Sequence, residues 1–333
     1  MSAIQACAAF VRSRYSAIIT ATLIAGLILG FFTSTPGQLI RRVNAPLIAV
    51  MIAAMGFTIT FRSLGAAARD WRGFSFGLAL NFVFAPLVCW VLAAAFLSSH
   101  PDLATGLILI GTVPCAGMAL VWAGLLEGDV PLASVINAAT MVLAPFLVPL
   151  LMSLLAGAFV TVSAGQMFLQ LTLTVLLPLL AGVIVREALE KRVRVRRILP
   201  LMPVVSAAAA ALLLFMAINT NVPTIVENAE LITPLLTSTV LLFPILFGTA
   251  YLVGTRLFSR GRNIAITYSS GMKNLPIAIG IAALSFNGAE MLPVAVAFAF
   301  QMLTAVVFYQ IFKAKSSPLG HAERVGNWTG LGW

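Results

Sequence analysis

Long apolar stretches, separated by short polar ones, follow one another along the whole chain. A helix needs about 20 apolar residues to cross the hydrocarbon core of a bilayer. Ten stretches are near that length, and we predict a membrane-spanning helix in each: residues 16–32, 43–61, 74–97, 103–125, 130–160, 167–185, 198–218, 235–257, 264–285 and 291–312. The first is expected to be an uncleaved helix, because it is long for a signal peptide and carries Gly26 and Gly30 at a helix-packing spacing.

The composition agrees with an all-α membrane protein. Hydrophobic residues make up 61% of the 333 residues and charged residues 9%, which leaves too little polar surface for a water-soluble globule. The formal net charge of +10 would suit nucleic acid, but in a membrane protein basic residues usually collect on the cytoplasmic side. Cys7, Cys89 and Cys115 are too far apart for a metal motif or a disulfide framework. We therefore expect a lipid bilayer as partner, and no nucleic acid, metal or cofactor.

The basic residues predict the topology. With the N-terminus in the cytoplasm, 17 of the 20 basic residues fall on the cytoplasmic side, Arg41 and Arg42 fall outside, and Lys273 lies within a span. This asymmetry is the one that the positive-inside rule describes. It predicts an integral protein of a bacterial inner membrane with both termini, and a tail at residues 316–333, in the cytoplasm.

The order of the spans predicts an internal repeat. Residues 1–185 would hold helices 1–5 together with helix 6, residues 186–197 a cytoplasmic basic linker, and residues 198–315 helices 7–10. The second repeat would begin at helix 6, near residue 167. Each repeat has an odd number of helices, five, so the second repeat begins on the opposite side of the membrane. It is therefore inverted relative to the first. Such 5+5 inverted repeats are a recurrent design of secondary transporters.

Helix-breaking residues interrupt the fourth and ninth predicted spans. Pro114 stands between two glycines in the fourth, and Gly271 and Pro276 flank Lys273 in the ninth. Apart from Arg256, next to the end of the eighth predicted span, Lys273 is the only formally charged residue in a predicted span. Broken helices that cross near the midplane can hold an ion or an anionic group through freed carbonyls and helix N-termini, whereas a simple kink would hold nothing.

The candidate binding residues lie in these two breaks and at bilayer depth in neighbouring spans. Asn81 and Asn137 carry amides that avoid lipid, so they either line the site or bridge helices, and both alternatives stay open. Thr140 shares the helix face of Asn137. The complete set is Pro114, Cys115, Ser269, Ser270, Met272, Lys273, Asn274, Asn81, Asn137 and Thr140.

Two motifs carry a family resemblance. The run 107–122, with Pro114-Cys115 and then Val121-Trp122, resembles the fourth helix of the arsenite efflux permeases. The run Ser270-Gly-Met-Lys-Asn274 resembles the ninth helix of the bile acid:sodium symporter family, whose motif ends in Gly-Met-Gln-Asn. The two families form one superfamily, and the resemblance covers about residues 21–312. It implies a ten-helix fold with a panel domain and a core domain, in which the fourth and ninth helices cross.

Several positions depart from both families. Ser269 and Lys273 stand where the resemblance places a Glu and a Gln implicated in sodium binding, and Ala119 and Leu120 replace a Ser-Asn pair. Pro276 stands where the arsenite permeases carry a Glu. Sodium needs several hard oxygen ligands. The resemblance therefore implies sodium sites without their ligands, and we predict that the Lys273 ammonium takes the place of the cation.

The sequence favours a secondary active transporter that works by alternating access. The predicted spans contain no Asp, Glu or His for an intramembrane enzyme, and polar stripes are too sparse for a channel, which stays a remote alternative. The expected substrate is arsenite or a related small oxyanion or oxyacid, exported without sodium; the alternative is a small organic anion. Cys115 is then either a soft ligand for trivalent arsenic or a packing residue.

Overall fold

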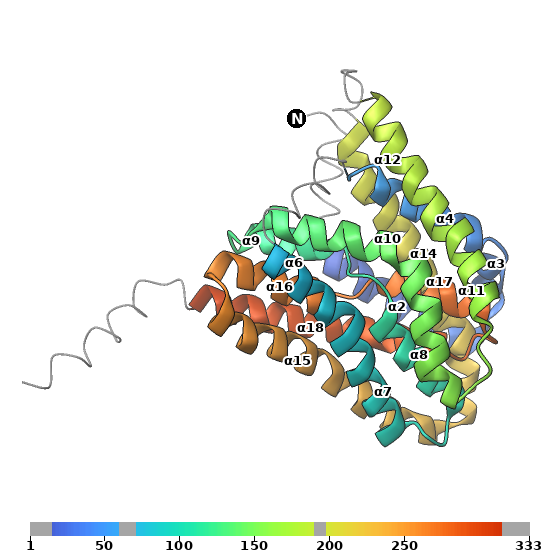
Figure 1. Ribbon diagram of the computed structural model, residues 1–333. Helices are drawn as coiled ribbons and strands as arrows, with labels where there is room; N and C mark the ends of the chain where they lie inside the picture. The colour runs from blue at the N-terminus through green and yellow to red at the C-terminus, as the bar shows by residue number, and fades with distance from the viewer. Residues whose placement is uncertain (1–14, 60–70, 190–197, 315–333) are drawn as a thin grey trace, which may run out of the picture.

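The computed structural model describes residues 15–59, 71–189 and 198–314 (Figure 1). Its α-helices are α2 (Tyr15–Phe32), α3 (Thr35–Arg42), α4 (Asn44–Gly56), α6 (Trp71–Ala79), α7 (Ala85–Phe96), α8 (Pro101–Thr112), α9 (Met118–Leu125), α10 (Val130–Leu155), α11 (Ala164–Leu171), α12 (Leu177–Leu189), α14 (Met202–Glu227), α15 (Ile232–Leu257), α16 (Arg260–Gly271), α17 (Leu275–Ser285) and α18 (Met291–Ala314). Shorter segments join them: the π-helical η2 (Leu80–Phe84) and η4 (Thr172–Leu176), and the 3-10 helices η3 (Ala156–Ala158), η5 (Leu199–Leu201) and η6 (Ala229–Leu231).

Within the described ranges, six helical segments are long and apolar enough to cross a membrane, or seven if α2 and α3 form one span bent by 116°. The six are Trp71–Phe96, Val130–Ala158, Ala164–Leu189, Met202–Glu227, Ala229–Leu257 and Met291–Ala314. All six coincide with predicted spans, so the prediction of an all-α membrane protein is confirmed. The other predicted spans hold shorter helices: α4 has 13 residues, and the fourth and ninth spans are each split in two. The ten-helix inverted repeat stays a prediction.

Some predicted features have a different local structure or fall outside the described residues. Arg41 and Arg42, expected in a loop, form the last turn of α3. The basic linker is described only up to Leu189, and residues 190–197, the tail and Cys7 lie outside the described ranges. The charge asymmetry that predicts the topology therefore rests on the sequence.

Prolines explain the two π-helical segments. Pro86 follows η2 and Pro178 follows η4, each at the second residue of the next α-helix. A proline has no N–H to donate to the carbonyl four residues earlier, and its ring crowds that carbonyl. The preceding turn widens as a result, and such wide turns often occur at functional sites. The widened turn of η2 contains Asn81.

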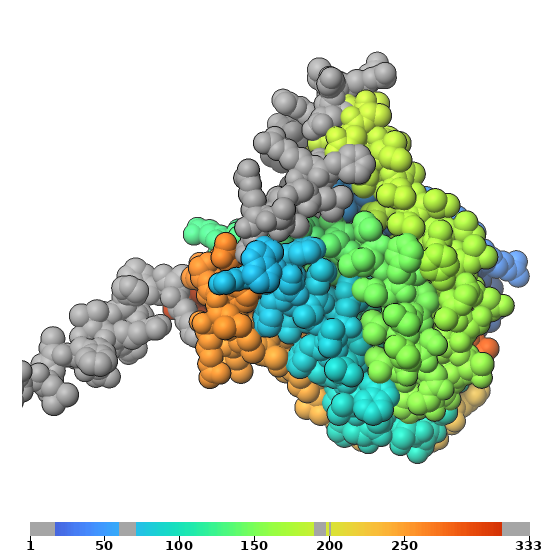
Figure 2. Space-filling view, viewed as in Figure 1, coloured from blue at the N-terminus to red at the C-terminus, as the bar shows by residue number. Residues whose placement is uncertain are grey.

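The helices pack into two groups that we call the small group and the large group. The small group contains α2, α3, α4, α12 and α14, with α14 against α2, α3 and α4, and α4 against α12. We count α11 with this group because it continues through η4 into α12 as one span, although it also contacts α10 and α17. The large group contains α6 to α10 and α15 to α18, where α15 contacts α7, α16 and α18. In Figure 1, α4 and α12 lie on one side of the molecule, and α15 and α18 lie on the other. Figure 2 shows α12 extending beyond its neighbours at one end.

Two glycines allow the backbones of α4 and α12 to approach closely. A Cβ atom on Gly56 would meet the carbonyl oxygen of Leu179, and a Cβ on Gly182 would meet the carbonyl oxygen of Ala53. The contacted atoms belong to helical backbone, which cannot move aside as a flexible side chain can. The close packing of these helices therefore depends on small residues, as is common in membrane proteins.

We expect Gly182→Ala to destabilise the protein by about 1–3 kcal/mol, the usual range for overpacking a tight contact. Thermal unfolding of the purified protein in detergent measures the effect. Gly248→Ala in α15 is the matched control, because nothing lies within 4 Å of a Cβ added there. That control should be neutral or slightly stabilising, since alanine favours helix. Equal melting temperatures for the two variants would contradict the close-packing argument.

Candidate functional site

The two predicted helix breaks are present in the structure. Helix α8 ends at Thr112 and α9 begins at Met118, while α16 ends at Gly271 and α17 begins at Leu275. Val113 takes an extended conformation, with φ −66° and ψ 154°, as expected for a residue that precedes a proline. Pro276 lies in the first turn of α17, where its missing N–H has no helical partner to lose.

The two breaks pair with each other. Cys115 and Lys273 face each other as an isolated antiparallel β-bridge. The amide of Ala116 donates to the carbonyl of Met272 at 2.8 Å, and the amide of Asn274 donates to the carbonyl of Pro114 at 2.9 Å. Backbone groups freed by a break at membrane depth need partners within the protein. Each break supplies those partners for the other, so the breaks meet as the sequence predicts.

The Lys273 ammonium lies in a shell of neutral oxygens. Its Nζ donates to the backbone carbonyl of Asn81 at 3.1 Å, to Oδ1 of the same residue at 3.1 Å, and to the carbonyl of Val113 at 3.3 Å. The residue is fully buried. Carbonyl and amide oxygens are the atoms that also hold hard metal cations. The ammonium therefore has the surroundings of a bound cation, with the charge attached to the chain.

Asn81 joins three elements around this charge. Its Nδ2 donates to the Gly77 carbonyl at 2.9 Å and to the Ser269 carbonyl at 3.0 Å. Because Nδ2 must face those two acceptors, Oδ1 is left to face the ammonium. Of the two alternatives open for Asn81, the structure shows the bridging one, since this residue ties η2 to α16 and to the second break.

Cys115 lies in a second small network. The Asn137 Nδ2 donates to the Cys115 carbonyl at 2.9 Å and to its sulfur at 3.3 Å, and the Thr140 hydroxyl accepts from the Cys115 amide at 3.2 Å. Thr140 also donates to the Asn137 carbonyl at 2.9 Å. The side chains of α10 thus hold the first break in position. The thiol itself is fully buried.

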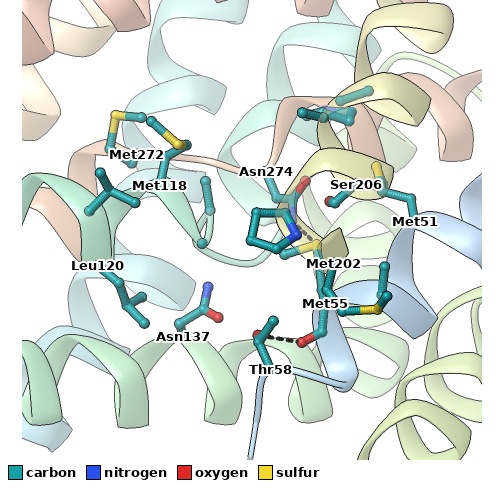
Figure 3. A pocket seen from close by; sticks show the side chains of 18 of the residues that line it. Met51, Met55, Thr58, Met118, Leu120, Asn137, Met202, Ser206, Met272 and Asn274 are labelled. Carbon is teal, nitrogen blue, oxygen red and sulfur yellow. Dashed lines mark hydrogen bonds between the residues drawn. The ribbon is translucent and has the colours of Figure 1, made fainter. Parts of the chain in front are cut away.

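A cavity of about 210 Å³ borders the paired breaks. Its walls come from α4 and α14 of the small group, and from α9, α10, the second break and α18 of the large group. Figure 3 shows Met55, Asn137 and Asn274 pointing into this space from three different elements. Half of the 12 methionines of the chain line it: Met51, Met55, Met118, Met202, Met272 and Met302. Thioether side chains are flexible and polarisable, which makes the wall adaptable.

The predicted site residues divide into those that line the cavity and those that support it. Asn137, Met272, Lys273 and Asn274 are lining residues. The supporting residues, which have no place in the lining, are Asn81, Pro114, Cys115, Thr140, Ser269 and Ser270. The hydroxyls of the two serines are buried without a hydrogen-bond partner. Since Asn81 and Val113 are also absent from the lining, the Lys273 ammonium reaches away from the cavity.

Gln301 of α18 is a site residue that the sequence reasoning missed. Its Oε1 accepts the Lys273 amide at 2.8 Å, and its side chain lines the cavity. Because a backbone N–H can only donate, the amide orientation is fixed and Nε2 remains available as a donor. The signal that could have found it was an amide at bilayer depth, the same signal that indicated Asn81.

The electrostatics of the cavity favour an anion. Lys273 is the one formally charged residue among the lining residues of the described chain. Helices α9 and α17 begin at the breaks, and helix N-termini carry partial positive charge. Amide groups of Asn137, Asn274 and Gln301 add hydrogen-bonding capacity. An anion with an apolar body would find donors at the breaks and methionine side chains around its remainder.

An integral membrane protein in which two broken helices pair beside a cavity has the architecture of a secondary transporter. Comparison with known families agrees with this class. The model of the Sodium Bile acid symporter family matches residues 45–228, more than half of the chain. The protein therefore belongs to this family of membrane transporters.

Individual relatives come from both branches indicated by the motifs. The chain is 28% identical over 278 residues to the probable sodium/metabolite cotransporter BASS1, chloroplastic, of Arabidopsis thaliana, an alignment that covers 81% of this chain and 66% of that protein. It is 25% identical over 257 residues to the uncharacterized sodium-dependent transporter YocS of Bacillus subtilis, covering 75% of this chain and 76% of YocS. It is 28% identical over 189 residues to the arsenical-resistance protein Acr3 of Alkaliphilus metalliredigens, covering 51% and 53%.

The position of Cys115 generates a prediction about arsenic. We expect Cys115→Ser to leave any arsenite resistance conferred by the protein unchanged, because the thiol lies outside the cavity lining. Serine keeps an acceptor for the Asn137 amide and removes only the soft sulfur. Growth of an arsenite-sensitive host, with protein level measured alongside, tests this. Cys89→Ser is the control at the other buried cysteine. A loss of resistance specific to Cys115→Ser would establish the thiol as an arsenic ligand.

Proposed function

We propose that this protein is a sodium-independent secondary transporter of a small organic anion, working by alternating access. The observation that carries the proposal is the Lys273 ammonium, held by three neutral oxygens at 3.1–3.3 Å where the two breaks meet. A mobile cation at this place would stabilise the paired breaks and be released in each cycle. Here the cation is part of the chain and stays bound.

The proposed role of Lys273 is to hold the breaks together. Its Nζ contacts η2 and the first break, while its backbone belongs to the second break. The charge also raises the electrostatic potential at the cavity, although the ammonium does not face it. We infer that the substrate anion binds to the side-chain amide groups of Asn274 and Gln301, and that the charge of Lys273 stabilises the bound anion from the side away from the cavity.

Two observations favour an organic anion over arsenite, although the expectation of arsenite export stays open. The cavity of about 210 Å³ is larger than the roughly 150 Å³ that accommodates benzene, and much of its wall is apolar. The Cys115 thiol does not line the cavity. Arsenite remains the second candidate because of the similarity to Acr3 over 189 residues.

The coupling prediction is tested with purified protein in liposomes. We expect wild-type transport to continue without sodium, and Lys273→Gln to reduce it by about tenfold or more, because three buried acceptors lose a charged donor. The Gln variant should not become sodium-driven, since the other sodium ligands of the resembling family are absent. Lys313→Gln, at the exposed end of α18, is the matched control and should transport normally.

Small amines provide a second measurement for Lys273. In Lys273→Ala, the oxygen shell keeps its place and the ammonium is lost, so ethylammonium in the assay buffer should restore part of the transport. Rescue by sodium instead would identify the shell as an ordinary alkali-cation site. Wild-type transport that requires a sodium gradient would refute the proposal.

The proposed orientation has its own test. We expect reporter tags inserted at Arg194 and after Trp333 to lie in the cytoplasm, because 17 of the 20 basic residues fall on that side of the ten-span topology. A tag at Ser99, between α7 and α8, should lie outside and serves as the internal control. Protease protection and thiol labelling of sealed vesicles report the side of each tag. Cytoplasmic and external tags in any other combination would exclude the ten-span topology.

A further inference from the structure

The boundary between the two helix groups differs at its two ends. Helices α4, α14 and α17 each have one end at the cavity and the other end remote from it. Thr58 after α4, Met202 in α14 and Pro276 in α17 line the cavity, whereas Asn44, Asn221 and Ser285 belong to the opposite ends of the same helices. We call the region formed by these opposite ends the remote end. The cavity separates the two helix groups at one end of their boundary, and the groups are in contact at the remote end.

Polar side chains of the small group join the remote end to the large group. Asn44 donates to the Gly280 carbonyl at 3.2 Å, and Asn221 donates to the Gly288 carbonyl at 3.4 Å. Arg41 of α3 donates to the Asn287 carbonyl at 3.0 Å. These contacts all reach the last turns of α17 or the segment that follows it.

Gln170 of α11 both donates and accepts a hydrogen bond at the end of α17. Its Nε2 donates to the Leu284 carbonyl at 3.2 Å, and its Oε1 accepts from the Ser285 hydroxyl at 2.6 Å. The last carbonyls of a helix have no partner within the helix and need one from elsewhere. At the end of α17 the small group supplies that partner. Water could replace it if the two groups separated, so breaking this contact leaves no buried group without a partner.

We propose that Arg41, Asn44, Gln170 and Asn221 form a detachable latch on α17 that keeps the remote end closed while the cavity end is open. The inference rests on the alternating-access mechanism proposed above. It assigns the structure to the state open toward the side of the basic linker, because the cavity-lining part of α14 directly follows that linker in the chain. The predicted topology makes this the cytoplasmic side and makes the latch the external gate.

Close packing beside the latch supports two discrete states rather than gradual loosening. A Cβ on Gly280 would collide with the Ile48 side chain of α4, next to the Asn44 contact. The bare glycine backbone thus lets α4 lie directly on α17. Tightly packed interfaces of this kind switch between arrangements instead of deforming continuously.

A labelling experiment tests the latch without any transport assay. In a background with Cys7, Cys89 and Cys115 replaced by serine, Ser206→Cys places a reporter on the cavity wall. We expect a membrane-impermeant maleimide to label it in inside-out vesicles. Gln170→Leu should slow this labelling about fivefold, because the state with the cavity end open loses its latch contact. Gln166→Leu, one turn earlier on α11, is the matched control and should change nothing.

Arg41→Gln provides a second latch variant and should slow the labelling in the same direction. Unchanged or faster labelling in both latch variants would overturn the latch, and it would do so whether or not the proposed substrate is correct.

Cross-linking tests the same contact in the opposite sense. In the same background, Gln170→Cys with Ser285→Cys places two thiols where the side chains now touch. We expect oxidation to cross-link the pair, to stop transport, and to leave Ser206→Cys open to labelling; reduction should restore transport. Failure to cross-link, or full transport by the cross-linked protein, would overturn the latch. Absence of sodium-independent transport by the parent cysteine-replaced background, with normal labelling of Ser206→Cys, would instead count against the proposed function and leave the latch in place.

Discussion

The structure depends on one requirement: polar backbone groups freed inside a hydrocarbon medium must find partners within the protein. A broken helix has unpaired donors and acceptors over a short stretch, and these groups need partners from other segments. Here two broken helices pair their extended segments as an antiparallel bridge, with hydrogen bonds of 2.8 and 2.9 Å. The same pairing brings Cys115 opposite Lys273. The helices around the bridge provide the side chains that complete it.

Lys273 adds a formal charge to this arrangement, which is costly at bilayer depth unless the charge is solvated by the protein. The widened turn of η2 supplies a backbone carbonyl and an amide oxygen, and the extended Val113 supplies another carbonyl. Proline thus shapes both sources of the oxygens around the ammonium. One source is the wide turn before Pro86, and the other is the extended residue before Pro114. The breaks and the charge are mutually dependent, because the breaks create the acceptors that the charge requires.

Much of this was predictable from the sequence, for identifiable reasons. Apolar runs are long and separated by polar residues, so the six long spans could be located, and proline with glycine marked both breaks. Asn81, Asn137 and Thr140 stood out as polar groups in apolar surroundings, and each contacts a break.

The cavity was not predictable in the same way. Membrane helices are apolar on all faces, so periodicity does not tell which side of α4, α14 or α18 faces inward. Six methionines and Gln301 came together only through contacts between distant segments. The fourth and ninth spans were likewise predicted as whole helices with a break, whereas the structure ends each first half in extended backbone. The role of Asn81 as a bridge also needed the position of Ser269, which lies 188 residues away.

The attachment of the cation to the chain has an energetic consequence. A bound sodium ion that crosses with an anion cancels its charge, so the pair is indifferent to the voltage across the membrane. An ammonium that never leaves the protein provides no such compensation, and as long as it keeps its proton each substrate anion moves its own charge through the field. That movement is worth about 2.3 kcal/mol per elementary charge at 100 mV. In a cell with a negative interior, the voltage alone would then expel the anion, and export would need no second solute.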